Sequence, residues 1–172
     1  MSLLSKLKGG DLRSIGKADV IVKQIGNGQT LFDEIFLGIF DNDPLIRMRS
    51  ADVAEKVSHK YPLLLKKHKS KILKNLGDFR HQEVKWHIAL MASYLGLNTT
   101  ESEKVFSELS KWAIADKSKI VRVNSLQALA DISMNNNNIK AKTLDLIKEQ
   151  IKMGVPSLMS RGKKLLTQLT NR

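Results

Sequence analysis

The stretch that decides the fold reads Asp43-Pro44-Leu45-Ile46-Arg47-Met48-Arg49-Ser50-Ala51-Asp52-Val53-Ala54-Glu55-Lys56-Val57. Within it, small or apolar residues lie at positions 46, 50, 53 and 57, at steps of four, three and four. This spacing places the four residues on one side of an α-helix. Asp43 and Pro44 are typical of a helix start, because Asp caps free N–H groups and Pro lacks one. The stretch therefore predicts a helix with one buried stripe.

The same stripe recurs three more times along the chain. Its first members lie at positions 46, 84, 121 and 158, so the intervals are 38, 37 and 37 residues. A second apolar series lies between these stripes, again 37 residues apart. Repetition with a period of 20–50 residues indicates stacked units that bury their apolar faces against their neighbours. The later stripes are Val84, Ile88, Met91 and Leu95; Val121, Ser125, Ala128 and Ile132; and Leu158, Gly162, Leu165 and Leu169; the second series is Ile35, Ile72, Leu109 and Leu146.

Each repeat is therefore expected to be a pair of antiparallel helices, an A helix followed by a B helix that carries the stripe. We predict an all-α protein with a single domain over residues 1–172. Residues 11–28 form an amphipathic stretch that we expect to be a helix capping the first repeat, and the residues before Gly9-Gly10 are expected to fray. The four repeats span about 29–60, 61–97, 98–134 and 135–170, with A helices near 31–40, 63–76, 103–115 and 139–151.

These B helices resemble the second helix of the HEAT-repeat superfamily, an armadillo-like class with bacterial HEAT-like members. That helix begins with Asp, a few residues, Pro, an aliphatic residue and Arg, followed by small and aliphatic residues in alternation. Asp43 to Arg47 match this pattern, and Asp116 to Arg122 match it without the Pro; Lys85 replaces the Arg in the second repeat and Met159 in the fourth. Over residues 29–170, the resemblance implies a right-handed α-α superhelix, a HEAT-like solenoid with B helices on the concave side. It implies no activity.

Composition favours an ordered protein with acidic partners. The formal net charge is +12, of which residues 1–40, 41–96 and 97–172 contribute +1, +5 and +6. A basic field of this size attracts phosphate, anionic lipid or acidic protein surfaces, without distinguishing them. The chain has no cysteine, no apolar run long enough for a membrane span and no start typical of a signal peptide. We therefore expect a cytoplasmic protein, and the sequence does not indicate its oligomeric state.

Catalytic and cofactor motifs do not stand out. His59, His68, His81 and His87 lack the spacing of zinc ligands, and neither a phosphate-binding glycine loop nor a nucleophile elbow occurs. Acidic pairs such as Asp52 and Glu55 are common on solvated helices. We expect a non-enzymatic protein with no metal and no cofactor.

Candidate binding residues lie opposite the buried stripe. An advance of about 100° per residue places Met48, Trp86 and Val123 on the far side of their B helices, with Leu90 and Tyr94 near Trp86. Exposed, contiguous apolar surface marks interaction sites, and Trp and Tyr are favoured anchors. Curvature of the stack could instead bury Trp86 against the next B helix. Trp112, on an A helix three residues after the stripe position 109, is expected in the core.

Two polar columns flank this apolar strip. Arg47, Lys85 and Arg122 form one, which either holds an anion or pairs with loop acids such as Asp43 and Asp116 of a neighbouring repeat. The other column is a candidate for ligand binding or a solvated edge, and it consists of Arg49, His87, Asn124 and Arg161.

The densest basic run lies on the second A helix, where Leu65, His68, Ile72 and Leu76 trace an inward stripe. The lysines between them point outward, either to contact phosphate or membrane or simply to be solvated. They are Lys66, Lys67, Lys69, Lys71 and Lys74.

Two functions remain open from the sequence. The first is a protein- or peptide-binding module whose concave face takes a partner, with a bias toward acidic ones. The alternative is nucleic-acid binding, for which the HEAT-like alkylpurine DNA glycosylases are a precedent; Trp86, Arg49, Lys85, Arg122, Arg161 and either Asp52 or Glu55 would serve there. A chaperone-like accessory role rests on analogy alone.

Overall fold

The computed structural model describes residues 2–11, 14 and 16–171. Within these ranges the chain is all-helical, without a strand. Three short 3-10 helices are η1 (Leu4–Leu7), η2 (Pro62–His68) and η3 (Leu76–Asp78). The α-helices are α1 (Ala18–Ile25), α2 (Gln29–Gly38), α3 (Pro44–Lys60), α4 (Lys69–Asn75), α5 (Gln82–Ser93), α6 (Thr99–Ala115), α7 (Lys119–Ser133), α8 (Asn137–Lys152) and α9 (Pro156–Thr170). No described helix is both long and apolar enough to cross a membrane.

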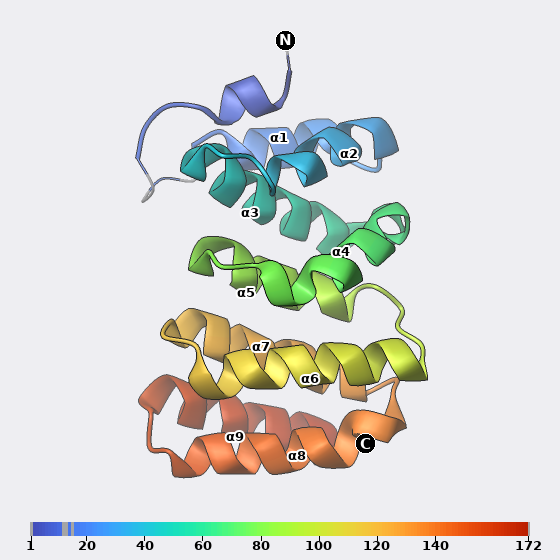
Figure 1. The fold of residues 1–172 in the computed structure, drawn as a ribbon, viewed down its shortest axis with the longest axis vertical. Helices are drawn as coiled ribbons and strands as arrows, with labels where there is room; N and C mark the ends of the chain where they lie inside the picture. The colour runs from blue at the N-terminus through green and yellow to red at the C-terminus, as the bar shows by residue number, and fades with distance from the viewer. Residues whose placement is uncertain (1, 12–13, 15, 172) are drawn as a thin grey trace.

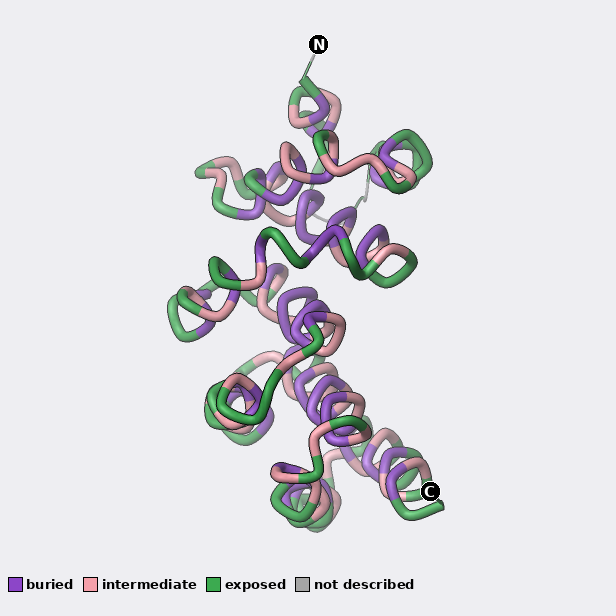
Figure 2. The backbone as a smooth tube through the Cα atoms, turned by 90° about the vertical axis from the view of Figure 1, so that its right-hand side faces the viewer, coloured by how far each residue is buried: buried purple, intermediate pink, exposed green. Residues whose placement is uncertain are grey.

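The helices lie across the long axis of the molecule, one level after another from the N-terminus to α8 and α9 (Figure 1). Seen from the side they form two columns (Figure 2). One column, the A layer, contains α2, α4 with its 3-10 flanks, α6 and α8. The other, the B layer, contains α3, α5, α7 and α9. Contacts run along the B layer from α3 to α5, α7 and α9, and they join α2 to α3, α6 to α7 and α8 to α9.

The core follows the predicted stripes. Every member of the four B-helix stripes is buried, and so is every member of the second series on the A helices. Where the stripe residue is small, the neighbouring helix comes close: a Cβ added to Gly162 would lie 2.6 Å from Ile151 Cγ1. Trp112 is also in the core, as predicted, with 5% of its surface exposed.

Helix starts agree with the expected signals. Pro44, Pro62 and Pro156 each occupy the first position of a helix. Asp43 caps α3, because its Oδ1 accepts a hydrogen bond of 2.9 Å from the backbone N–H of Leu45. A further cap, which the sequence analysis did not use, is the capping box of α6, in which Asn98 and Glu101 bond each other's backbone N–H groups.

Two segments differ from expectation. The second A helix is divided into η2, α4 and η3, although its predicted inward stripe is buried throughout. Its first two members, Leu65 and His68, are three residues apart, which is one turn of a 3-10 helix, so they face inward together. The expected frayed start is wrong, because Leu3 and Leu7 are buried. Part of the predicted cap at residues 11–28 lies outside the described residues, and its described helix covers only α1.

Candidate functional site: the B face

The B face is the side of the B layer opposite its buried stripes. Met48, Trp86 and Val123 occupy equivalent positions on α3, α5 and α7, rotated by about 200° from the first stripe residue of each helix. All three are half-buried, as is Leu90, one turn after Trp86. Trp86 and Val123 pack against the edge of the core. We call these four residues the apolar strip.

The B face is sheltered on α3, α5 and α7, whereas α9, the last helix of the B layer, exposes Ser160 and Thr167. In the described spans 46–58 of α3, 83–93 of α5 and 121–133 of α7, every residue is buried or half-buried. The A helix α6, by contrast, exposes Lys104 and Lys111 in its middle. Figure 2 shows the same asymmetry, with exposed residues concentrated in the column opposite the one that ends at the C-terminus. Side chains on neighbouring B helices therefore shield one another.

The first flanking column contacts the next repeat along the chain. Lys85 forms an ion pair with Asp116, in which both side chains are largely buried. Arg47 Nη2 lies 3.5 Å from Glu83 Oε1, and Arg122 Nη2 donates to Gln150 Oε1 at 2.8 Å. The predicted alternative of pairing with a neighbouring loop Asp thus occurs for Lys85, whereas Asp43 serves as a helix cap instead.

Two members of the second flanking column, Arg49 and Arg161, contact the part of the stack that precedes their own repeat. Arg161 Nη1 donates to Gln127 Oε1 at 2.5 Å, which joins α9 to α7. Asn124 donates to the carbonyl of Ile120 in its own helix. Residues one position before or after the outward-facing residue are rotated by about 100° to either side, so on a stacked helix they point at the neighbours. Most members of the two columns are therefore used in contacts between neighbouring repeats.

Arg49, a member of the second flanking column, uses its guanidinium entirely in contacts within the chain. It is 1% exposed, and its guanidinium donates to the carbonyls of Leu7, Gly9, Asp11 and Ser14 at 2.5–3.2 Å. The N-terminal segment thus folds around one buried side chain, and Arg49 is not available to a partner, contrary to expectation. A guanidinium suits this role because it presents five donors in a planar fork.

Two glycines make the approach of the N-terminal segment possible. Gly10 and Gly16 have φ angles of 83° and 55°, in the left-handed region that favours glycine. A Cβ at Gly16 would lie 3.0 Å from Arg49 Cζ, and one at Gly10 would lie 3.2 Å from Arg49 Nη2. The segment around Arg49 therefore depends on residues without side chains at these two positions.

His87 is likewise inaccessible, contrary to its prediction as a binding residue. It is 2% exposed in α5, and its Nδ1 is buried without a hydrogen-bond partner among the described residues. Burial, with a smaller contribution from the charge of Lys56, lowers the pKa of His87 from 6.5 to about 3. The imidazole is therefore neutral at physiological pH and acts as a packing residue beside Trp86.

Carboxylates lie farther along the B face, toward the C-terminal ends of the B helices. We call Asp52, Glu55 and Asp131 the carboxylate row. Each has a partner: Asp52 pairs with Lys56 at 2.9 Å, Glu55 accepts from the Tyr94 hydroxyl at 2.8 Å, and Asp131 accepts from Gln127 and Gln168. Burial raises the pKa of both Glu55 and Tyr94. Tyr94, predicted as part of the binding surface, therefore also ties α5 to α3.

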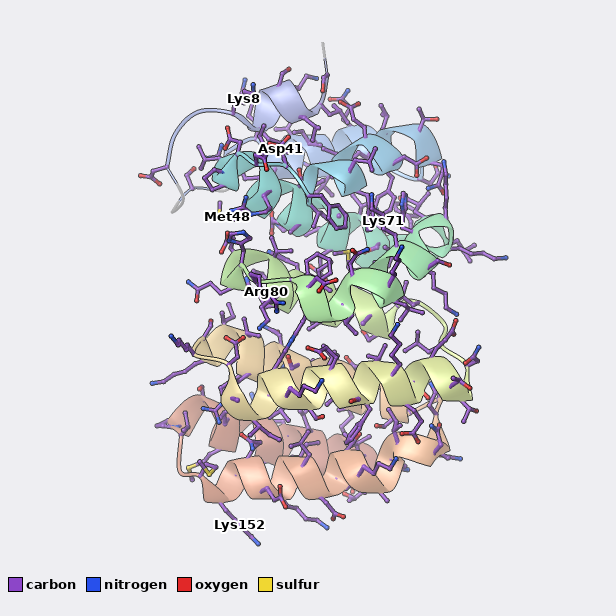
Figure 3. The ribbon with its side chains drawn as sticks, in the orientation of Figure 1. Lys8, Asp41, Met48, Lys71, Arg80 and Lys152 are labelled. Carbon is purple, nitrogen blue, oxygen red and sulfur yellow. The ribbon has the colours of Figure 1, made fainter. Side chains whose placement is uncertain are left out.

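Sequence reasoning missed the edge where the A–B loops meet. One cavity of about 240 Å³ there is lined by Phe40, Asp41, Arg47, Phe79 and Arg80 among others. A second cavity, of about 450 Å³, lies between the next two repeats and is lined by residues 80–83 and 115–118. Figure 3 labels Asp41 and Arg80 toward this edge, with Met48 near it and Lys71 on α4 farther along. The regular position of these loops in the repeat is the sequence signal that would have grouped them.

The lysine run lies on η2 and α4 of the A layer. Lys66, Lys67, Lys71 and Lys74 are exposed and Lys69 is half-buried, so the predicted outward orientation holds. Two members are paired: Lys67 Nζ lies 2.5 Å from Asp33 Oδ2, and Lys69 Nζ lies 2.6 Å from Glu101 Oε2. Beneath them, His68 contacts the same Asp33 at 2.6 Å and stacks on Phe36.

Of the predicted binding residues, the structure brings together the four members of the apolar strip and Tyr94 on the B face. Whether they bind a partner stays a prediction. No group of His, Asp and Glu suited to hold a metal ion occurs within the described part of the chain. Comparison with known proteins adds no relative, since no family model, curated protein or solved structure matches the chain.

Proposed function

We propose that the chain is a HEAT-like α-solenoid with a right-handed turn, whose B layer is the concave wall, and that this wall binds a peptide or protein helix. Three observations support the proposal for the fold: the 37-residue period, the continuous contacts from α3 to α9, and the sheltered side chains of the B layer. Side chains crowd one another on the inner side of a curved stack and spread apart on the outer side.

The apolar strip is the observation that carries the proposed function. Its four residues lie on three successive B helices and are only half-buried, so part of their apolar surface stays in contact with water. Polar side chains near them, such as Asp52 and Glu55, already have partners within the chain. Contiguous apolar surface of this kind is removed from water when a partner binds. Trp is enriched among the residues that contribute most to binding in protein interfaces, and Met adapts its shape to different partners.

A partner helix is the occupant that fits best. A helix presents apolar residues at spacings of three and four, which can follow a strip that crosses several helices. The A–B loop edge beside the strip carries the exposed cations Arg80, Lys117 and Lys119. These cations favour partners with acidic residues at the end that reaches this edge.

The carboxylate row makes the B face a poor surface for nucleic acid. Glu55 and Asp131 lie on the same wall as the apolar strip, accept hydrogen bonds from neutral side chains and form no ion pair among the described residues, so their negative charge would repel a phosphate backbone. A protein helix avoids this repulsion where it presents neutral or basic residues to these carboxylates. The protein-binding proposal is therefore preferred to the nucleic-acid alternative on this face.

Selection from a displayed library of random helical peptides tests the proposed function. Wild-type protein is expected to enrich peptides with apolar residues at positions i, i+3, i+4 and i+7, and Val123→Glu should bind them at least tenfold more weakly. Ile114→Glu is the matched control, because Ile114 is an exposed apolar residue of the A layer. The absence of enriched peptides, or equal loss in both variants, would exclude the apolar strip as the binding surface. Binding of duplex DNA by the wild-type protein, with an affinity that falls steeply as salt rises, would instead favour the nucleic-acid alternative.

A further inference from the structure

A second surface, on the A layer, combines positive charge with a protruding apolar residue. Leu63, the second residue of η2, is 81% exposed, the most of any large apolar residue described. It follows Pro62, whose fixed φ suits the first position of this 3-10 helix. An exposed leucine is ordinary in isolation, but here it stands among lysines.

The lysine face consists of Lys60, Lys66, Lys67, Lys71 and Lys74. Between Glu55 and Asp78 the sequence contains no acidic residue. Asp33 approaches this face from α2 and binds Lys67, and Glu101 approaches from α6 and binds Lys69 beside it. Lys66 and Lys74 form no ion pair within the described residues, and neither do Lys60 and Lys71, whose ammonium groups lie over aromatic rings of the chain. The face therefore keeps most of its charge.

The backbone beneath the lysine face is held rigidly. Leu65, Ile72 and Leu76 are buried, and His68 is locked between Asp33 and the ring of Phe36. The exposed lysines of η2 and α4 therefore stand on a backbone that is anchored in the core.

An apolar groove adjoins Leu63. It has a volume of about 400 Å³, and its wall contains Pro62, Leu63, Tyr94 and Leu95, with Lys66 and Lys69 at the rim. A cationic rim above an apolar wall fits an amphiphile with a negative head and a hydrocarbon body. Free phosphate would use only the rim. An acidic peptide would use the charge but gain little from a leucine that projects into solvent.

We propose that the lysine face docks on anionic lipid bilayers, with Leu63 inserted among the lipid headgroups. A bilayer supplies a continuous negative surface and, directly beneath it, hydrocarbon for a projecting side chain. Leu63 and the lysines other than Lys60 belong to η2 and α4 of the A layer, and none of the residues changed in the test below belongs to the apolar strip of the B layer. The two proposals can therefore fail independently.

Vesicle sedimentation of the full chain tests the lipid proposal. Binding is expected to vesicles of 30% phosphatidylserine in phosphatidylcholine, with little binding to phosphatidylcholine alone, and it should weaken as salt rises. One lysine near such a surface changes affinity about fivefold. The double variant Lys66→Glu/Lys74→Glu should therefore bind at least 25-fold more weakly, and Leu63→Ser about tenfold more weakly.

Matched controls separate docking from general charge attraction. Lys104→Glu/Lys152→Glu removes the same net charge from exposed positions of α6 and α8, and Ile114→Ser removes an exposed apolar residue elsewhere. Both should retain binding within a few fold, and circular dichroism should show that all variants remain folded. The proposal would be overturned if the two lysine double variants lost vesicle affinity equally, or if Leu63→Ser bound vesicles as tightly as wild type. Binding to polyglutamate without binding to vesicles would also overturn it.

Discussion

Acidification should destabilise the protein through His87. Burial keeps its imidazole neutral, with a pKa of about 3 in the folded chain against 6.5 for the exposed group. Between pH 6.5 and pH 3 the His87 side chain binds a proton in the unfolded chain but not in the folded chain. The contribution of neutral His87 to the free energy of unfolding is therefore complete above pH 6.5 and is lost as the pH falls toward 3. Each pH unit in this window is equivalent to about 1.4 kcal/mol, so acidification from pH 6.5 to 5 costs about 2 kcal/mol.

Urea unfolding at pH 7 and pH 5 measures this loss. In His87→Leu the loss between pH 7 and pH 5 should be smaller than in wild type by about 2 kcal/mol, while stability at pH 7 should change by only about 1 kcal/mol, because the buried Nδ1 that is removed has no partner among the described residues. His81→Gln, at an exposed position, is the matched control and should behave as wild type. Lowering of the His68 pKa by burial acts in the same direction in both proteins and cancels from the comparison. If His87→Leu loses as much stability at pH 5 as wild type, His87 is not the buried neutral group described above.

Five substitutions at four positions test other contacts, each by chemical unfolding. Trp86→Ala should cost about 1–2 kcal/mol because the indole is half-buried, whereas Trp112→Ala should cost about 3–5 kcal/mol; similar losses would show that Trp86 is a core residue. Arg49→Met should lower the free energy of unfolding by about 3 kcal/mol or more and speed proteolysis near residue 10. Arg49→Lys should lose less stability than Arg49→Met but more than wild type, because an ammonium cannot reproduce the planar fork of donors. Unchanged proteolysis in Arg49→Met would contradict the described N-terminal packing. Gly162→Ala should destabilise by about 1–3 kcal/mol, since its Cβ would meet Ile151; the gain of about 1 kcal/mol expected from helix propensity alone would contradict the close packing.

The helical pairs and their core could be predicted because both depend on local spacing. A stripe such as Val121 to Ile132 fixes the buried side of its helix wherever the helix lies in the fold. The 37-residue period then places each pair relative to the next. The capping box of Asn98 and Glu101 was also readable from the sequence, since Asn followed three residues later by Glu marks a helix start.

The roles of the flanking residues depended on contacts that local spacing does not contain. Arg49 binds carbonyls about 40 positions earlier in the chain, and a stretch before Gly9-Gly10 gives no sign that it will pack against α3. His87 differs from a surface histidine only through the helices that cover it. The sequence could nevertheless have predicted that both columns point at neighbouring repeats, because their residues are rotated by about 100° to either side of the outward position.

The emission of Trp86 tests the central claim most directly, that the B face is an open wall on which a partner lies. In Trp112→Phe, Trp86 is the only tryptophan of the chain. Its fluorescence in the free protein should be partly quenched by acrylamide. Saturation with a peptide enriched on the wild type should shift the emission to shorter wavelength and reduce quenching, because the indole leaves water. A bound peptide that leaves both the emission and the quenching of Trp86 unchanged would contradict the claim.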